Sequence, residues 1–381
     1  MLTSRRAFLS QVAIVTAGAT LAAPALANSS PEVRWTMASA FPPSLEIVFD
    51  GARTCAAATS EATDGRFTIS VQPAGSTASA YDALNAVADG KADCAHTSLS
   101  YSWTQHPAYA FGSGVPFGMN ARQHAAWLRI GGGNERIDDL LAERGLMALP
   151  MGSAGGQMAG WFRKEVRKAG DLAGMKLRIG GFAGKVLKAC GATVVALPKD
   201  QILEALASGS LDAFESIAPY DDERFAGGRE RAGAISTVAP YYYCPGWWKG
   251  ETQLHLIVSR ERFAGLPKAY QAAVKSAAAL ADGRVRAQYD AANPAALKRL
   301  VMGGAQLRLF PQEVLESCYR ATNNLYAELS AQNAKFKTVA DCYMAFRSDQ
   351  YLWWQVAEYP FDNFMIRERR AESLTIGARI N

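Results

Sequence analysis

The sequence has 381 residues, of which 49% are hydrophobic and 20% are charged, with a formal net charge of +5 at pH 7. This charge is small and dispersed, which argues against a nucleic-acid-binding surface. Beyond the N-terminus no run approaches the ~20 apolar residues that a membrane-spanning helix needs. The remaining ~350 residues exceed the usual size of a single core and predict two lobes.

Residues 1–27 have the pattern of a secretory signal peptide. Arg5 and Arg6 precede an apolar stretch over 8–26, and A-L-A at 25–27 forms a small-residue cleavage pattern. The setting S-R-R-A-F-L at 4–9 favours the twin-arginine export route. We therefore expect a periplasmic protein whose mature chain begins near Asn28, with the formal charge lowered from +5 to +3 by the loss of Arg5 and Arg6.

Strands and helices alternate along the next part of the chain. Strand patterns cover 34–39, 66–71 and 92–97, and helical patterns cover 45–64 and 81–88. This alternation predicts βαβ units and an open α/β sheet.

The second lobe is expected to begin after residues 149–152, where the alternation resumes. A turn leads into a strand over 155–162, further strand patterns lie at 176–179, 194–198 and 211–215, and helical patterns lie at 183–189 and 199–207. The last third is different, because long helical patterns at 268–300, 311–333 and 338–357 dominate it.

The common enzyme motifs are absent. The sequence contains no H-E-x-x-H, no G-x-S-x-G, no Walker loop and no G-x-G-x-x-G. The six cysteines form no C-x-x-C, and their spacing does not say whether any of them pair in an oxidising compartment. The absence of these motifs argues against an enzyme without excluding one.

Arg178 is the sharpest candidate for a binding residue. It lies at the end of a predicted strand that runs into Gly180 and Gly181. A guanidinium is a planar fork that can give a carboxylate two charge-assisted hydrogen bonds. The alternative is a surface arginine or an ion pair that stabilises a lobe.

Five short motifs carry a family resemblance. They are V-P-F-G-M at 115–119, K-L-R-I-G-G at 176–181, P-Y-D-D-E at 219–223, Y-Y-Y-C-P-G-W-W at 241–248 and D-Q-Y-L-W at 349–353. Together they resemble the DctP-type solute receptors of tripartite ATP-independent periplasmic (TRAP) transporters. The resemblance covers about 34–366 and is closest to the subgroup that binds 2-oxo acids and similar monocarboxylates.

The resemblance implies an α/β, two-lobed periplasmic-binding-protein-like fold with a long linking helix and extra C-terminal helices, which closes over its ligand. It implies that Arg178 grips the carboxylate. It also implies that Na⁺ or Ca²⁺ bridges ligand and protein through Gln157, Glu215 and the main chain of Ser216. Carboxylate and amide oxygens are hard ligands suited to these ions. A hydrogen-bonded pair at the lobe interface is the alternative role for Gln157 and Glu215.

The sequence departs from the subgroup at this implied metal site. Ser216 stands where tryptophan is usual, and Lys249 stands where an acid is expected, with Glu251 two places on. Two like charges ~4 Å apart repel by about 4 kcal/mol at an effective dielectric of ~20. In one version, Lys249 replaces the cation and pairs with Glu215 and the ligand. In the other, Lys249 points to solvent and Glu251 supplies the metal ligand.

Aromatic residues supply the remaining cleft candidates. Phe41 follows the first predicted strand, Tyr101 follows the strand at 92–97, and Trp247 with Trp248 could form an apolar wall. The alternative for each of them is a place in the core.

The lobe boundaries follow from this interpretation. We expect the first lobe to comprise 32–152 and about 240–260, the second to comprise 153–239 and about 261–310, and C-terminal helices to cover 311–381. The aromatic residues Tyr351, Trp353 and Trp354 could pack within the chain or in a homodimer that exchanges a C-terminal helix, as some relatives do.

The leading hypothesis is a periplasmic receptor that passes a small organic anion, a 2-oxo or 2-hydroxy monocarboxylate, to TRAP membrane subunits. Two alternatives stay open, namely an exported enzyme with Glu215 as its acid–base group and a chemosensory binding protein. The sequence does not identify the acid.

Overall fold

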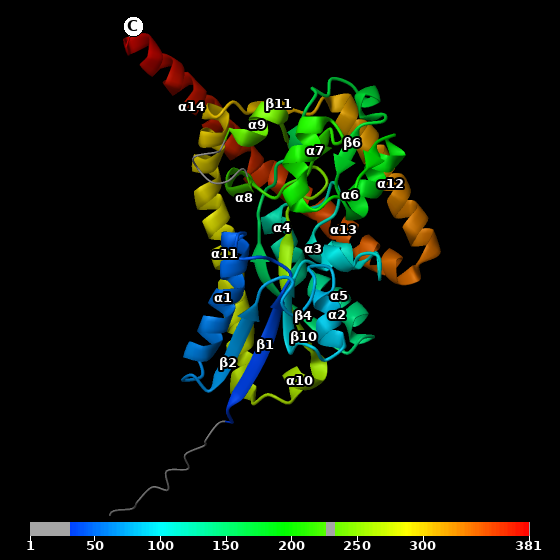
Figure 1. Cartoon of the computed structure of the whole chain (residues 1–381), viewed down its shortest axis with the longest axis vertical. Helices are drawn as coiled ribbons and strands as arrows, with labels where there is room; N and C mark the ends of the chain where they lie inside the picture. Colours follow the sequence, from blue (N-terminus) through cyan, green and yellow to red (C-terminus); the bar gives the residue numbers. More distant parts are fainter. Residues whose placement is uncertain (1–30, 226–232, 381) are drawn as a thin grey trace, which may run out of the picture. The chain divides into compact units, whose positions relative to one another are not determined.

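Two β-sheets organise the chain (Figure 1). The computed structural model describes residues 31–225 and 233–380, so the predicted signal peptide lies outside the described residues. The first sheet has the order β2 (Phe67–Gln72), β1 (Val33–Ser39), β3 (Cys94–Thr97), β10 (Gln253–Ser259) and β4 (Leu146–Ser153). The second has the order β11 (Gln306–Leu309), β9 (Tyr241–Cys244), β5 (Gly160–Phe162), β8 (Ala213–Phe214), β6 (Lys176–Arg178) and β7 (Thr193–Val194).

Helices connect and cover these sheets. The helices of the N-terminal part are α1 (Glu46–Glu61), α2 (Ala83–Ala88), α3 (Tyr109–Ser113), α4 (Ala121–Arg129) and α5 (Gly133–Ala142). Those around the second sheet are α6 (Gly181–Ala189), α7 (Ile202–Ser208), α8 (Pro219–Phe225) and α9 (Ala234–Val238). The C-terminal part carries α10 (Arg260–Ala264), α11 (Lys268–Met302), α12 (Gln312–Gln332), α13 (Ala334–Ala357) and α14 (Tyr359–Ile380). The predicted α/β class is confirmed.

The direction of the strands decides where the functional residues lie. β1 runs parallel to β2 and β3, because α1 and α2 return the chain to the same end of the sheet. In the second sheet, β6 runs parallel to β7 and β8. The carboxyl ends of parallel strands meet at one edge of a sheet, and open α/β sheets bind ligands at that edge. The segments that follow β1, β3, β6 and β8 are therefore the places to look for a site.

Two segments without helix or strand carry the chain between the sheets. One is 154–159, between β4 and β5, and the other is 245–252, between β9 and β10. We expected about 240–260 to belong to the first lobe as a whole, and this was wrong for β9. The strand pairs with β5 and β11 in the second sheet, and only β10 joins the first.

The 35-residue helix α11 runs past both sheets (Figure 1). Its N-terminal half buries Tyr270, Val274 and Ala281 in a core shared with β1, β2 and β10. Near its C-terminus, Leu300 packs with Trp161 and Tyr242 of the second sheet. Assigning all of 261–310 to the second lobe was therefore wrong, since one amphipathic face of α11 spans both cores. This is the long linking helix that the resemblance implied.

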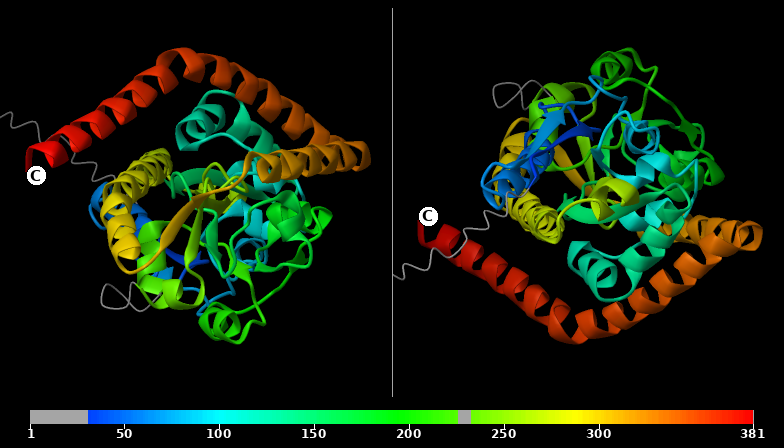
Figure 2. Two further views of the ribbon diagram at one scale, coloured as in Figure 1. Left: turned by 90° about the horizontal axis from the view of Figure 1, so that it is seen from above. Right: turned by 90° about the horizontal axis from the view of Figure 1, so that it is seen from below.

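The last three helices extend the chain beyond the two sheets. α12 and α13 pack on each other, and Phe336 and Tyr343 of α13 enter the core of the first sheet beside Phe111. Figure 2 shows α14 leaving the far end of α13 at an angle, and in Figure 1 its end projects beyond the two sheets. None of the described helices is long and apolar enough to cross a membrane.

Candidate functional site

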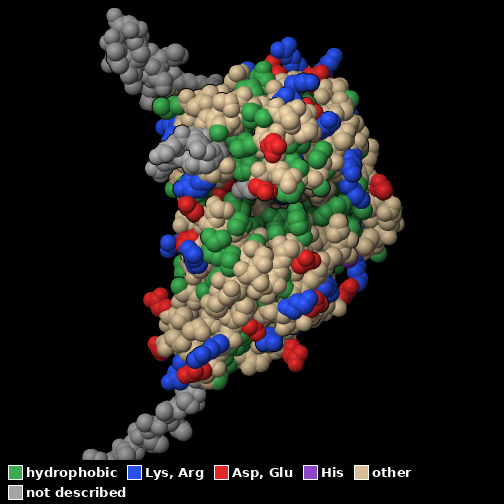
Figure 3. Space-filling view, viewed as in Figure 1, with side chains coloured by type: hydrophobic (Ala, Val, Ile, Leu, Met, Phe, Trp, Pro, Cys, Tyr) green, Lys and Arg blue, Asp and Glu red, His purple; other side chains and the backbone are tan. Residues whose placement is uncertain are grey.

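A cavity of about 1200 Å³ opens between the carboxyl edges of the two sheets. Its walls come from the segments after β1, β3, β6 and β8 and from both inter-sheet segments. Figure 3 shows hydrophobic side chains gathered in a hollow across the middle of one face. An apolar cavity with few polar groups is the usual form of a small-molecule site.

Arg178 ends β6 and lines this cavity. Its Nε donates a hydrogen bond to the Leu197 carbonyl oxygen at 3.2 Å, which fixes the plane of the guanidinium. Among the described residues, its two terminal nitrogens have no hydrogen-bond or ion-pair partner. Gly181 follows with φ 62°, a left-handed conformation that favours glycine. A fixed, half-buried guanidinium with two unused donor groups is suited to holding a carboxylate.

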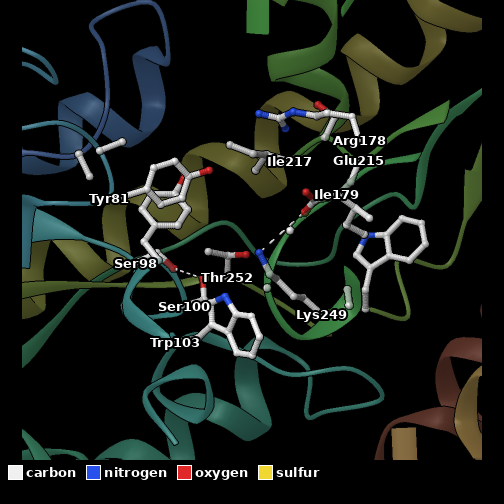
Figure 4. A pocket seen from close by; sticks show the side chains of 18 of the residues that line it. Tyr81, Ser98, Ser100, Trp103, Arg178, Ile179, Glu215, Ile217, Lys249 and Thr252 are labelled. Carbon is white, nitrogen blue, oxygen red and sulfur yellow. Dashed lines mark hydrogen bonds and ion pairs between the residues drawn. The ribbon is translucent and has the colours of Figure 1, made fainter. Parts of the chain in front are cut away.

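Glu215 and Lys249 form an ion pair beside Arg178 (Figure 4). Glu215 directly follows β8, and its backbone N–H donates to the Arg178 carbonyl oxygen at 3.1 Å. Lys249 comes from the segment between β9 and β10, and its Nζ lies 3.8 Å from Glu215 Oε1. The side chains are 22% and 19% exposed, so the pair is largely shielded from bulk water. The version in which Lys249 points to solvent is wrong.

Gln157 and Ser216 complete the polar wall. Gln157 Nε2 donates to Thr252 Oγ1 at 2.9 Å, and its Oε1 is buried without a partner among the described residues. Ser216 lines the cavity, and its hydroxyl donates to Asp222 on α8. Within the described part of the chain, no group of three or more His, Cys, Asp or Glu side chains could hold a metal ion.

Aromatic rings form the wall on the side of the first sheet. Phe41 follows β1 and packs against His96, and its ring centroid lies 6.0 Å from that of Tyr101. Tyr101 belongs to the 3-10 helix at 99–102 that follows β3. Burial raises the pKa of the Tyr101 phenol above its usual range, so its hydroxyl is neutral and can donate a hydrogen bond.

Two expected site residues do not reach the cavity. Trp247 is buried in the core of the second sheet, where its ring stacks on Phe117 with centroids 5.1 Å apart, and Trp248 lines the cavity instead. Glu251 is fully buried and bonds to His124 and Ser153. It does not line the cavity, because His124 of α4 and Ser153 of β4 hold its carboxylate elsewhere.

The sequence reasoning missed several residues of the wall. Trp103, Tyr81, Thr252 and Phe182 all line the cavity. Trp103 and Phe182 pack together across it, with ring centroids 5.9 Å apart, although they follow strands of different sheets. Their places in the sequence could have indicated them, because Trp103 lies shortly after β3 and Phe182 shortly after β6, where the strands end at the cavity.

A cavity of this kind is consistent with the solute-binding proteins to which the chain is similar. The model of the family described as bacterial extracellular solute-binding protein, family 7 (DctP) matches residues 38–333. The chain belongs to this family. A monocarboxylate 2-oxoacid-binding periplasmic protein of Nostoc sp. (strain PCC 7120) is 38% identical over 366 residues, which cover 94% of this chain and 98% of that protein.

Two solved structures of similar proteins contain bound ligands. A TRAP transporter solute-binding protein of Bordetella bronchiseptica is 36% identical, with a TM-score of 0.84 over 90% of this chain and 99% of that chain. It is a dimer with copurified calcium and picolinate in one active site and an apo second site. A TRAP periplasmic solute-binding protein of Pseudoalteromonas atlantica, with bound sodium and pyruvate, is 30% identical. Its TM-score is 0.81 over 87% of this chain and 99% of that chain. All three relatives are named as binding proteins.

Proposed function

We propose that this protein is the periplasmic receptor of a TRAP transporter, that it binds a small 2-oxo or 2-hydroxy monocarboxylate, and that it delivers this anion to the membrane subunits. The observation that carries the proposal is Arg178, held by Leu197 with its terminal nitrogens unpaired in a cavity of about 1200 Å³. The names and ligands of the relatives at 30–38% identity support the same ligand class.

The residues that line the cavity make different contacts with the ligand. Arg178 donates to both oxygens of the carboxylate, and the Lys249–Glu215 pair faces the oxygen on the neighbouring carbon. Gln157 and Ser216 contribute polar contacts at the same end. Phe41, Tyr101 and Trp248 enclose the rest of the ligand and exclude water, which strengthens the charged contacts.

Closure of the cavity completes the binding step. We propose that residues 32–152 and 153–239 form the centres of the two lobes, and that the segments at 154–159 and 245–252 bend between them. Both segments also carry binding residues, Gln157 and Lys249. Ligand contacts would therefore favour the closed form directly.

A thermal-shift screen of mono- and dicarboxylates tests the proposed function. A ligand at 100 times its Kd adds about 2.7 kcal/mol to the free energy of unfolding. We expect 2-oxo or 2-hydroxy monocarboxylates to raise the melting temperature and neutral analogues such as the amides to leave it unchanged. If no carboxylate shifts the melting temperature, the proposed function is wrong.

The C-terminal helices fit a homodimer that exchanges α14. Large apolar side chains are exposed along α13 and α14, namely Tyr351, Leu352, Trp353, Val356, Tyr359, Phe361, Phe364, Met365 and Ile366. A second copy of the chain is the partner that would bury them. We expect light scattering to give a dimer for the mature chain and a monomer for a chain that ends at residue 358. A monomeric mature chain at high concentration would contradict the exchange.

Export by the twin-arginine route is part of the proposal. Replacing Arg5 and Arg6 by a lysine pair is expected to leave the protein in the cytoplasm, because that route reads the two arginines. Fractionation of cells that express the two forms measures this. Unchanged delivery to the periplasm would point to an ordinary secretion signal instead.

A further inference from the structure

The place where the family resemblance implies a bound cation holds a lysine in this protein. Calcium or sodium accompanies the organic anion in the two solved relatives. Here the oxygens available for such an ion are those of Glu215, the amide oxygen of Gln157 and the main chain of Ser216. The Nζ of Lys249 lies 3.8 Å from the Glu215 carboxylate, so it occupies the side of the carboxylate that faces the cavity (Figure 4).

These residues do not fit a metal ion. A metal ion bound to Glu215 would lie beside the Lys249 ammonium, where the two positive charges repel each other, and a divalent ion doubles the repulsion of a monovalent one. Glu215 is the one carboxylate in the set, and Lys249 already neutralises it. Because the pair is about four-fifths buried, water screens this repulsion only weakly.

The lysine fits the same position well. An ammonium group has three donors and no acceptor. One donor faces Glu215, and the same cavity is lined by Gln157, whose Oε1 is a buried acceptor that has no partner among the described residues. A further donor is left for an oxygen of the ligand. Since Lys249 and Glu215 neutralise each other, the charge of Arg178 remains to balance one ligand carboxylate.

We propose that Lys249 takes the place of the bound cation, so that this receptor binds its monocarboxylate without a metal ion. The inference rests on the proposed function, because it concerns how the same anion is held. It assigns Lys249 to the oxygen beside the carboxylate and predicts that calcium and sodium do not affect affinity.

Isothermal titration of the mature chain with pyruvate as the probe tests this. The protein is stripped with a chelator and titrated in potassium buffer, then again with added calcium or sodium, and its metal content is measured by mass spectrometry. We expect the three Kd values to agree within about twofold, since a tenfold change corresponds to about 1.4 kcal/mol, and no stoichiometric metal to remain after purification.

Variants at the lysine sharpen the result. Lys249→Glu restores an acid, and we expect it to bind pyruvate only when calcium is added. Lys249→Met removes the donor and should weaken metal-free binding at least tenfold, which is about 1.4 kcal/mol. Lys176→Met is the matched control, because Lys176 lies at the opposite, exposed end of β6 and should bind as the unmodified chain does.

The outcomes separate the two ideas. If the unmodified chain loses pyruvate binding in the chelator and regains it with calcium or sodium, the lysine inference is overturned and the receptor function stands. If neither pyruvate nor any other carboxylate of the thermal-shift screen binds under any condition, the proposed function fails. Should Lys249→Glu not fold, as judged by circular dichroism, the metal dependence of the unmodified chain still decides.

Discussion

Replacing Arg178 tests whether its guanidinium binds the ligand carboxylate, and the expected loss of affinity follows from the hydrogen bonds that the side chain makes and leaves free. The guanidinium uses Nε to hold Leu197 O and has both terminal nitrogens left for a ligand. Lysine keeps the charge, but its single ammonium group cannot donate to Leu197 O and at the same time give the carboxylate two parallel hydrogen bonds. We expect Arg178→Lys to lose one charge-assisted hydrogen bond, about 1.5–3 kcal/mol or roughly a 10- to 150-fold rise in Kd. Arg178→Met loses both, about 3–6 kcal/mol.

Isothermal titration with the best carboxylate from the thermal screen measures these values. The melting temperature of the ligand-free protein should change little, because the Arg178 side chain has only one hydrogen-bond partner among the described residues. Arg163→Lys is the matched control, since Arg163 directly follows β5 in the same sheet and pairs with Asp212 at 3.6 Å outside the cavity. If Arg178→Lys binds within about twofold of the unmodified chain, a change well under 1.4 kcal/mol, the assignment of Arg178 is refuted.

Three further predictions concern stability and oxidation. Burial lowers the pKa of His96 and of His255 to about 3, so both stay neutral when folded while the unfolded chain takes up protons below about pH 6.5. For each histidine, the free energy of unfolding should therefore fall by about 2 kcal/mol as the pH is lowered from about 7 to about 5. Thermal unfolding at the two pH values measures this, and an unchanged melting temperature would contradict the prediction. Glu251→Gln is expected to lower the melting temperature without changing ligand affinity, because the Glu251 carboxylate bonds to His124 and Ser153 within the protein. A large loss of ligand affinity in this variant would show that Glu251 takes part in ligand binding. The sulfurs of Cys190 and Cys318 lie 3.8 Å apart, so treatment with a mild oxidant should join them in a disulfide with the loss of two hydrogens. If mass spectrometry finds two free thiols after this treatment, the prediction is wrong.

The strand-end residues could be predicted from the sequence. Arg178 ends β6, Glu215 directly follows the neighbouring parallel strand β8, and Phe41 and Tyr101 follow two strands of the other sheet. Parallel pairing brings such residues to one edge, so local strand patterns were enough to indicate Arg178, Phe41 and Tyr101, whereas Glu215 was singled out by the family resemblance. Their roles in binding stay predictions.

The inter-sheet segments could not be predicted at the level of single side chains. The segment at 245–252 has no periodic pattern, so nothing in the sequence says which of Trp247 and Trp248 faces the cavity. The same segment turns Lys249 toward Glu215 and buries Glu251 with His124. Those directions depend on packing against residues 34 and 127 positions away in the sequence, which a pattern of neighbours does not contain.

The helix α11 illustrates the same limit at a larger scale. Its length and type follow from its pattern, but its assignment to one lobe was wrong because its face packs on both sheets. Which core a long amphipathic helix contacts depends on tertiary packing and not on its own periodicity.

The crystal structure of the complex with the carboxylate that binds most tightly tests the central claim most directly. We expect the two carboxylate oxygens within hydrogen-bond distance of the Arg178 terminal nitrogens, and Lys249 Nζ on the oxygen of the neighbouring carbon. A ligand that lies elsewhere, or that turns its carboxylate away from Arg178, would contradict the account.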